Sequence, residues 1–575
     1  MARFRVWAPK ATHAAVETGQ GRFAMTKKPG GWYEAEVTSA HHGDDYWFVL
    51  DDGERLPDPR SQSQPQGIAG PSRLVDQDEF RWRHDEWSVN AFDKAIVYEL
   101  HVGTFSQDGT FDGVVAHLDH LVELGVTHVE LMPVNEFSGR HGWGYDSVDI
   151  YSPHHAYGGP AGLKRLVDGC HERGLAVIAD VVYNHFGPLG NYLDRFGNYF
   201  TDRYATPWGR AINFDGPGSD EVRRYLCDHA LMMLRDYRFD GLRLDAVHAI
   251  FDMSAVHFLE QLAAETRKLE AQLGRKLLLI AESNLNDPRM VRAPEAGGYG
   301  LDAQWSDDFH HALHSVLTGE QTGYYQDFGS VADLTKAIKH PYVYDGRYSA
   351  FRQRHYGRKP QGLPAGKFVV FLQNHDQVGN RATGERSGHL MDIARLKIGA
   401  AILLIGAFVP MLFQGEEWAA STPFLYFTDH HDHELAKNVR AGRRSEFAAF
   451  GGRPEQIPDP QAPDTFLKSK LDWSEVDHSP HRDVLQWYRS LIRLRREVPA
   501  LTQLPIEATQ VEYDQTALWI TIARGPISVL CNLGEGERTL PCTEGKVLLS
   551  SGEVVRQRHG LKMPAGSVAV VLSET

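Results

Sequence analysis

The chain has 575 residues, of which 42% are hydrophobic and 23% charged, and its formal net charge is −15. A chain of this length has room for several domains with large cores, and its composition excludes a disordered, collagen-like or disulfide-scaffold protein. The acidic charge, without a basic block, argues against nucleic acid or an anionic membrane surface as a partner and favours a neutral substrate.

Residues 1–90 are predicted to form a small N-terminal β-sandwich. Short aromatic and β-branched runs at 4–7 and 46–50 are typical of strands, and the Pro-Gly-Gly sequence at 29–31 indicates a turn. A polar stretch with several prolines, 57–72, is expected to be a long loop that leads out of this module.

Residues 91–500 are predicted to form a (β/α)8 TIM barrel with long loop insertions, because short apolar strands alternate with helical patterns. Helices are expected at 111–124, 160–172 and 219–237, the last with Ser219 as its N-cap. The longest insertions, at 183–219 and 417–481, are expected to shape the active site. The predicted strands are 95–104, 127–133, 176–183, 241–245, 276–282, 303–306, 367–374 and 410–414.

Residues 501–575 return to short strands, such as 518–522 and 567–572, and are predicted to form a C-terminal β-sandwich. The fold class is therefore α/β: a barrel with a β module before it and another after it. The longest apolar run, 398–413, is shorter than the ~20 residues of a membrane helix, so we expect a buried helix that leads into a buried strand.

Acidic residues stand at the carboxyl ends of predicted strands, where a barrel of this kind carries its chemistry. One such acid is usually structural, because a charge at the end of an apolar strand must be paired or hydrated. Several together, with Arg243, His185 and His375 beside them, suit glycoside hydrolysis, in which one carboxyl protonates the leaving oxygen and another attacks or activates water. The acids are Asp180, Asp245, Glu282 and Asp376.

The segments that carry these acids resemble the signature regions of the α-amylase superfamily of glycoside hydrolases. They read Asp-Val-Val-Tyr-Asn-His at 180–185, Gly-Leu-Arg-Leu-Asp at 241–245, Ala-Glu-Ser at 281–283 and Asn-His-Asp at 374–376. The resemblance implies that Asp245 is the nucleophile, Glu282 the general acid and base, and Asp376 the acid that favours ring distortion. It also implies retention of configuration, with the carboxyls of Asp245 and Glu282 about 5–5.5 Å apart.

The same resemblance implies the residues that support and surround these acids. Arg243 would keep Asp245 ionised and oriented, and Tyr145 would stack on the sugar. Asp180 and Asn184 would have structural roles. The other expected substrate-binding residues are His185, Leu244, Ala246, Val247, His248, Asp307, Asp308, Phe309, His310, His311, His375, Gln377, Val378, Gly379 and Asn380.

Neither a metal nor another cofactor is expected. Asn184 matches a calcium-binding position of many amylases, but no convincing set of further ligands is visible, and the histidine-rich stretch 430–434 lacks regular ligand spacing. The latter is expected to be solvated or to line the cleft. The chain has few cysteines, and none forms a Cys-x-x-Cys pair: Cys170, Cys227, Cys531 and Cys542. Because cysteines are few and residues 1–10 lack a secretory apolar segment, a reducing, cytoplasmic location is expected.

Finer features resemble particular members of the superfamily. Residues 4–9 and 98–105 are similar to isoamylase-like and branching enzymes. Several other segments are similar to the maltooligosyltrehalose trehalohydrolases, a family within the superfamily: 282–288, 305–311, 318–325, 375–380 and 413–424.

This second resemblance implies hydrolysis of the α-1,4 bond next to the terminal trehalose unit of maltooligosyltrehalose. It also implies a functional pairing with the synthase that makes this substrate. Residues 246–248 and 307–311 would read the trehalose unit. Two alternatives stay open: a branching or debranching enzyme that acts on α-1,6 linkages, and a non-catalytic carbohydrate-binding barrel, which typically lacks the acids that are present here.

Overall fold

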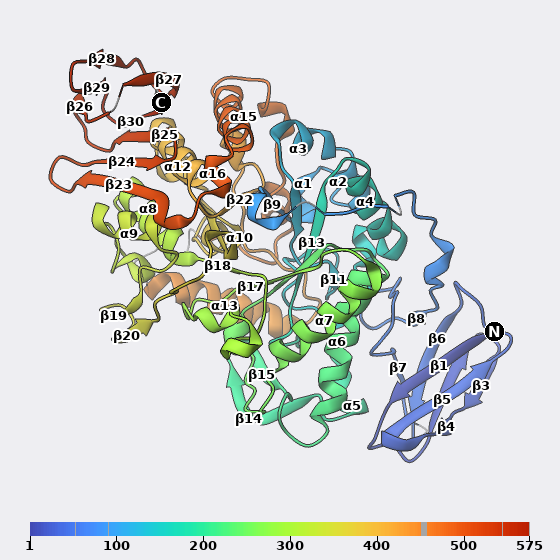
Figure 1. The fold of residues 1–575 in the computed structure, drawn as a ribbon. Coiled ribbons are helices and arrows are strands. Elements are labelled where there is room, and N and C mark those ends of the chain that lie inside the picture. Colours follow the sequence, from blue (N-terminus) through green and yellow to red (C-terminus); the bar gives the residue numbers. More distant parts are fainter. Residues whose placement is uncertain (52, 85, 90, 450–456, 543, 574–575) are drawn as a thin grey trace.

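The computed structural model describes residues 1–51, 53–84, 86–89, 91–449, 457–542 and 544–573. Figure 1 shows a central barrel with the N-terminal β region (blue) on one side and the C-terminal β region (red) on another. Residue 90, the predicted end of the first module, and residues 574–575 lie outside the described residues.

Eight parallel strands close into a barrel in chain order, which confirms the predicted fold class. The observed strands lie inside the predicted ranges, except that β22 begins one residue earlier. The ranges were predictable because strands that are buried on both faces have nearly continuous apolar sequences. The strands are β9 (Val97–Leu100), β10 (His128–Leu131), β13 (Ala176–Val181), β16 (Gly241–Leu244), β17 (Leu278–Ala281), β18 (Ala303–Trp305), β21 (Phe368–Phe371) and β22 (Val409–Phe413).

Helices between the strands cover the outside of the barrel. The predicted helix at 111–124 is two helices, because His117 leaves helical geometry with φ −113° and ψ 6°. The predicted cap at Ser219 is wrong: the cap is Gly218, whose φ of 81° suits glycine. The helices are α2 (Phe111–Val115), α3 (Leu118–Leu124), α4 (Gly159–Glu172), α6 (Ser219–Arg235), α7 (Phe258–Leu273), α8 (Asp307–Thr318), α9 (Val331–Lys339), α12 (Ile393–Ile405) and α15 (His481–Glu497).

The apolar run 398–413 is a buried helix, α12, that leads into the buried strand β22, as predicted. No helix in the described part of the chain combines the length and the apolar character that crossing a membrane requires.

The predicted β modules at both ends are confirmed, and each has two sheets among the described residues. The N-terminal strands are β1 (Ala2–Trp7), β5 (Trp32–Val37) and β4 (Thr26–Lys27), then β3 (Gly21–Ala24), β2 (Ala14–Thr18), β6 (Asp45–Leu50), β7 (Arg55–Leu56) and β8 (Ser72–Arg73). The C-terminal strands are β23 (Thr509–Asp514), β24 (Trp519–Arg524), β25 (Ile527–Asn532), β30 (Ser567–Ser573) and β27 (Gly545–Ser550), then β26 (Arg538–Leu540), β29 (Gly560–Met563) and β28 (Val555–Gln557).

Insertions after the strands carry short elements of their own. Residues 450–456 of the predicted insertion 417–481 lie outside the described residues. The inserted hairpins are β11 (Asn135–Glu136) with β12 (Asp149–Pro153), β14 (Phe200–Thr206) with β15 (Gly209–Ile212), and β19 (Asp345–Ser349) with β20 (Arg354–Gly357). The inserted helices include the short α10 (His375–Gly379) and α14 (Pro463–Lys468) and the longer α13 (His433–Ala449).

Candidate active site

Strand register places two of the predicted acids side by side. Leu244 of β16 pairs with Ala281 of β17, and Asp245 and Glu282 are the next residues along these parallel strands. The same register aligns Val181 of β13 with Leu244. The carboxyl ends of three neighbouring strands therefore deliver their acids to one edge of the barrel, where this fold carries its chemistry.

Arg243 is a fully buried cation that contacts three of these acids. Its Nη1 lies 2.7 Å from both carboxylate oxygens of Asp180 and 3.0 Å from Oδ1 of Asp245. Its Nη2 lies 3.7 Å from Oε2 of Glu282, and its guanidinium sits 4.3 Å from the centre of the Trp305 ring. A buried guanidinium keeps its charge, so it favours the ionised form of the nearest carboxylates.

Asp245 is held by hydrogen bonds at both carboxylate oxygens. The Asn184 side-chain amide donates to its Oδ2 and to its backbone carbonyl, both at 2.8 Å, while Arg243 occupies Oδ1. The Asp245 side chain is 13% exposed. It is therefore oriented, paired with a cation and still open to the solvent side, as a nucleophilic carboxylate must be.

Glu282 lies in a different electrostatic environment. Burial is the main cause that raises its pKa to about 8, and Asp245 and Asp307 raise it further, while Arg243 opposes the rise. The backbone N–H of Ala246 donates to its Oε2 at 2.5 Å. Ala246 has a φ of 38°, an unusual value for a residue with a side chain, and such strain is common at functional sites. Near neutral pH Glu282 holds a proton, which suits a general acid.

The third acid, Asp376, lies in the short helix α10 and is the most exposed of the three, at 46% of its side chain. The side chain of Asn374 caps this helix by accepting the N–H groups of Asp376 and Gln377, at 2.9 and 3.2 Å. Asn380 donates to Oδ1 of Asp376 at 3.1 Å. The cap and this hydrogen bond fix where the carboxylate points.

A chain of hydrogen bonds runs beneath the acids. Glu99 of β9 pairs with Nδ1 of His375, whose Nε2 lies 2.8 Å from the hydroxyl of Tyr145. That hydroxyl donates to Asp180 at 2.6 Å. Burial lowers the pKa of His375, but the charges of Glu99 and Asp376 outweigh it and raise the pKa to about 9. The imidazole is therefore a second fixed cation at the floor of the site.

Asp245, Glu282 and Asp376 line one cavity of about 510 Å³. The volume lies in the usual range for small-molecule sites. Aromatic rings surround the acids, as in many sites that bind sugars by stacking: Trp143, Tyr145, Trp208 and Tyr426. Trp208, at the turn between β14 and β15, is 48% exposed and stacks on His185 with ring centres 5.4 Å apart.

The expected substrate-binding residues divide into two groups. Those that line the cavity are Tyr145, His185, Ala246, His248, Asp307, His375 and Asn380. Those that do not line it are Arg243, Leu244, Val247, Asp308, Phe309, His310, His311, Gln377, Val378 and Gly379.

The start of α8 explains why only the first residue of 307–311 reaches the cavity. Asp308 faces inward and accepts hydrogen bonds from the side chain of Asn286 and from the backbone of Val343 and Tyr344, at 2.7–2.8 Å. His310 is also satisfied inside the protein, with Nδ1 2.7 Å from the carbonyl of Leu372. Both side chains are thus engaged within the protein, and neither lines the cavity.

Sequence reasoning missed several residues of the site. Glu99, the partner of His375, stands in the segment 98–105, whose sequence shows a family likeness but gives no sign of this pairing. Aromatic residues inside the predicted insertions were the available signal for Trp208 and Tyr426. His430 lines the cavity, 3.8 Å from Asp146, as one of the two expectations for its stretch foresaw.

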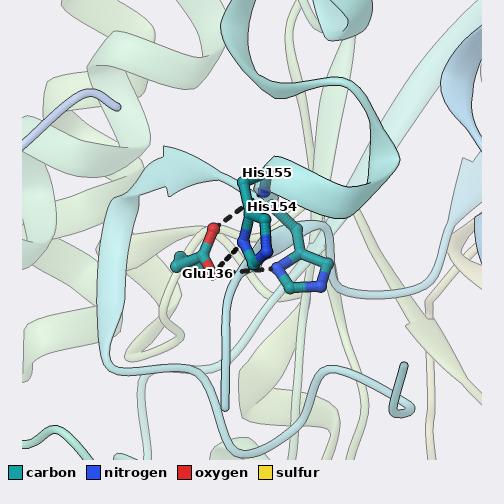
Figure 2. Close-up of side chains that lie close together, drawn as sticks. All are labelled: Glu136, His154 and His155. Atoms are coloured by element: carbon teal, nitrogen blue, oxygen red, sulfur yellow. Dashed lines mark hydrogen bonds and ion pairs between the residues drawn. The ribbon is translucent and has the colours of Figure 1, made fainter. Parts of the chain in front are cut away.

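Among the described residues, one group of three has ligand atoms close enough for a metal ion, and it lies outside this cavity: Glu136, His154 and His155 (Figure 2). The amide of Asn184 is engaged with Asp245, and its Oδ1 faces His185. That engagement gives Asn184 a role in orienting the acid.

Comparison with known proteins gives consistent results. Residues 63–206 match the Alpha-amylase family, described as "Alpha amylase, catalytic domain". The chain is 47% identical to a malto-oligosyltrehalose trehalohydrolase of Arthrobacter ramosus over 100% of both chains, and 45% identical to one of Rhizobium sp. (strain M-11) over 99% of this chain and 97% of that one. A crystal structure from Salmonella typhimurium, provisionally described as an alpha amylase, is 38% identical with a TM-score of 0.92, covering 100% of this chain and 97% of that chain.

Proposed function

Because the chain belongs to the malto-oligosyltrehalose trehalohydrolase family of the α-amylase superfamily, and is thus a glycoside hydrolase, we propose that it cleaves the α-1,4 bond next to the terminal trehalose unit of maltooligosyltrehalose. The products are trehalose and a shortened malto-oligosaccharide. The observation that carries this proposal is the convergence of Asp245, Glu282 and Asp376 on one cavity.

In the first step the carboxylate of Asp245 attacks the anomeric carbon, and the bond to the leaving oxygen breaks as Glu282 gives that oxygen its proton. Trehalose leaves with the proton. In the second step Glu282 takes a proton from water, the water oxygen attacks the anomeric carbon, and the ester bond to Asp245 breaks. The two displacements retain configuration, and Asp376 holds the sugar hydroxyls in the distorted ring.

The raised pKa of Glu282 and the fixed cation beside Asp245 support this division of roles. A carboxyl that keeps its proton suits the donor, and a carboxylate paired with a cation suits the nucleophile. Among residues 307–311, Asp307 at the start of α8 is the one that lines the cavity. We propose that its side chain contacts the trehalose unit.

The substrate supply and the compartment complete the proposal. A synthase that makes maltooligosyltrehalose would act before this enzyme, and no nucleic acid partner is proposed because the net charge is −15. Cys170, Cys227 and Cys531 are buried and form no disulfide, which supports a reducing, cytoplasmic location.

Product analysis tests the proposed bond specificity. Incubation with maltotriosyltrehalose should release trehalose and maltotriose in equal amounts, and plain maltopentaose should be cleaved far more slowly. Asp245→Asn should lose at least about 10⁴-fold in rate, by the scale of removing a catalytic residue. Faster action on α-1,6-branched glucan would favour a branching or debranching enzyme, and the absence of any product would favour a non-catalytic barrel.

A further inference from the structure

A second cluster of chemically active side chains lies at the base of the hairpin β11–β12. Glu136 ends β11, and His154 and His155 follow the end of β12 directly. Figure 2 shows the two imidazoles on the same carboxylate. The mechanism proposed above uses none of these three residues.

The potential ligand atoms of this cluster all lie within 4.8 Å of one another, close enough to share one small cation. Nδ1 of His155 lies 2.7 Å and Nδ1 of His154 lies 3.1 Å from the same oxygen, Oε1 of Glu136. Neighbouring ligands in a regular tetrahedron with bonds of about 2.05 Å are about 3.3 Å apart. The distance from His155 to Glu136 is therefore about half an ångström too short for this geometry. The His155 side chain is 25% exposed, which leaves it room to move away from Glu136 by that amount.

Within this buried cluster, the ring nitrogens of His154 are left without hydrogen-bond partners. The side chains of Glu136 and His154 are completely buried. Neither ring nitrogen of His154 makes a hydrogen bond, and its approach to Glu136 lacks hydrogen-bond geometry. A buried imidazole without a partner is costly, and a bound metal ion would supply the missing partner of His154.

The second oxygen of the carboxylate is already positioned. The backbone N–H of His155 donates to Oε2 of Glu136 at 2.8 Å, which leaves Oε1 directed at the two rings. The backbone N–H of His154 donates to the carbonyl of Val134 at 2.8 Å, so the hairpin itself holds the first histidine. Such supporting bonds orient the ligands of metal sites.

We propose that Glu136, His154 and His155 bind one Zn²⁺ ion, with a water molecule as fourth ligand on the partly exposed side of His155. Two imidazole nitrogens and one carboxylate oxygen form a donor set that suits zinc. The loop between β11 and β12 carries Trp143 and Tyr145 into the catalytic cavity. Zinc therefore clamps the base of the hairpin that presents these rings.

Metal binding to the full-length protein tests the proposal. Chelator-treated protein should bind one tight equivalent of Zn²⁺ in calorimetry and should melt a few degrees higher with excess zinc, because a ligand of the folded state stabilises it. Co²⁺ at the same site should give the visible absorption of a four-coordinate ion. His154→Gln and His155→Gln should each weaken zinc binding at least about 100-fold, the upper end for residues that only support ligands.

Matched variants separate this site from adventitious binding. The exposed residues His431 and His433, in the histidine-rich stretch 430–434, serve as the control: the double variant His431→Ala/His433→Ala should keep the tight equivalent. His314→Gln, which removes a buried histidine 2.8 Å from Glu320, controls for folding. The proposal is wrong if no tight equivalent binds, if the equivalent survives His154→Gln or His155→Gln, or if the double variant loses it.

These outcomes are independent of the hydrolase function. Asp245, Glu282 and Asp376 line a cavity to which the zinc ligands do not contribute, so metal-free protein should still hydrolyse its substrate. A failure of zinc binding would leave the proposed reaction in place, and a failure of hydrolysis would leave the metal site in place.

Discussion

Arg243 contributes to the charge state of the active site. It pairs at 2.7 and 3.0 Å with Asp180 and Asp245 but reaches Glu282 only at 3.7 Å. An opposite charge favours ionisation most strongly at the shortest distance, so Arg243 only partly opposes the burial that raises the pKa of Glu282. Burial of Glu282, together with its greater distance from this cation, therefore suits it to the role of proton donor.

The pKa of Glu282, raised to about 8, predicts the alkaline limb of activity. The kcat/KM for maltotriosyltrehalose should fall tenfold per pH unit above about pH 8, because the ionised acid cannot protonate the leaving oxygen. A malto-oligosyl fluoride, whose leaving group needs no proton, should lack this limb. An identical limb with the fluoride would show that another group titrates.

At the scale of elements, the site depends on where strands and helices begin and end. The paired residues Leu244 and Ala281 bring Asp245 and Glu282 into line without any contribution from loops. Asp376, in contrast, is placed by a helix of one turn, α10, which is too short to be stable without its cap.

The cap of α10 therefore gives a test at this scale. Asn374→Ala should destabilise the protein by about 1 kcal/mol, the usual cost of a lost N-cap. It should also lower kcat/KM by about tenfold or more, because the carboxylate of Asp376 loses its fixed position. Asn374→Ser keeps a capping oxygen and should restore most of both, measured by thermal melting and steady-state kinetics; equal losses in both variants would argue against a capping role.

Element boundaries also explain what could be predicted from the sequence. The barrel strands were predictable because their apolar runs are nearly unbroken, and the acids after them follow from that placement. Asp308 and His310 could not be placed, since the direction of each side chain depends on α8 starting at Asp307. The pairing of Glu136 with His154 and His155 depends on the β11–β12 hairpin, which short runs of mixed residues do not signal.

At the scale of the whole molecule, the buried carboxyl of Glu282 lowers the stability of the folded protein near neutral pH. The barrel tolerates a carboxyl whose pKa is about 8 in the folded state and near its ordinary value of 4.5 when unfolded. Between these values the folded protein holds a proton that the unfolded chain releases. The contribution of Glu282 to stability therefore decreases as pH rises from about 4.5 to about 8.

Replacing this acid should stabilise the protein. Glu282→Gln should raise the free energy of unfolding at pH 8 by on the order of a few kcal/mol, since each pKa unit corresponds to about 1.4 kcal/mol. The gain should shrink towards zero below about pH 4.5, where both states are protonated. Denaturant unfolding of both proteins across this range measures the difference; a gain independent of pH would contradict the assignment.

The central claim is that Asp245 and Glu282 act on one glucose ring by two displacements, and a ¹H NMR time course of maltotriosyltrehalose hydrolysis tests it most directly. We expect free trehalose together with maltotriose whose new reducing end is first the α anomer. If the β anomer forms first, or if maltotriose forms without trehalose, the account of this site is contradicted.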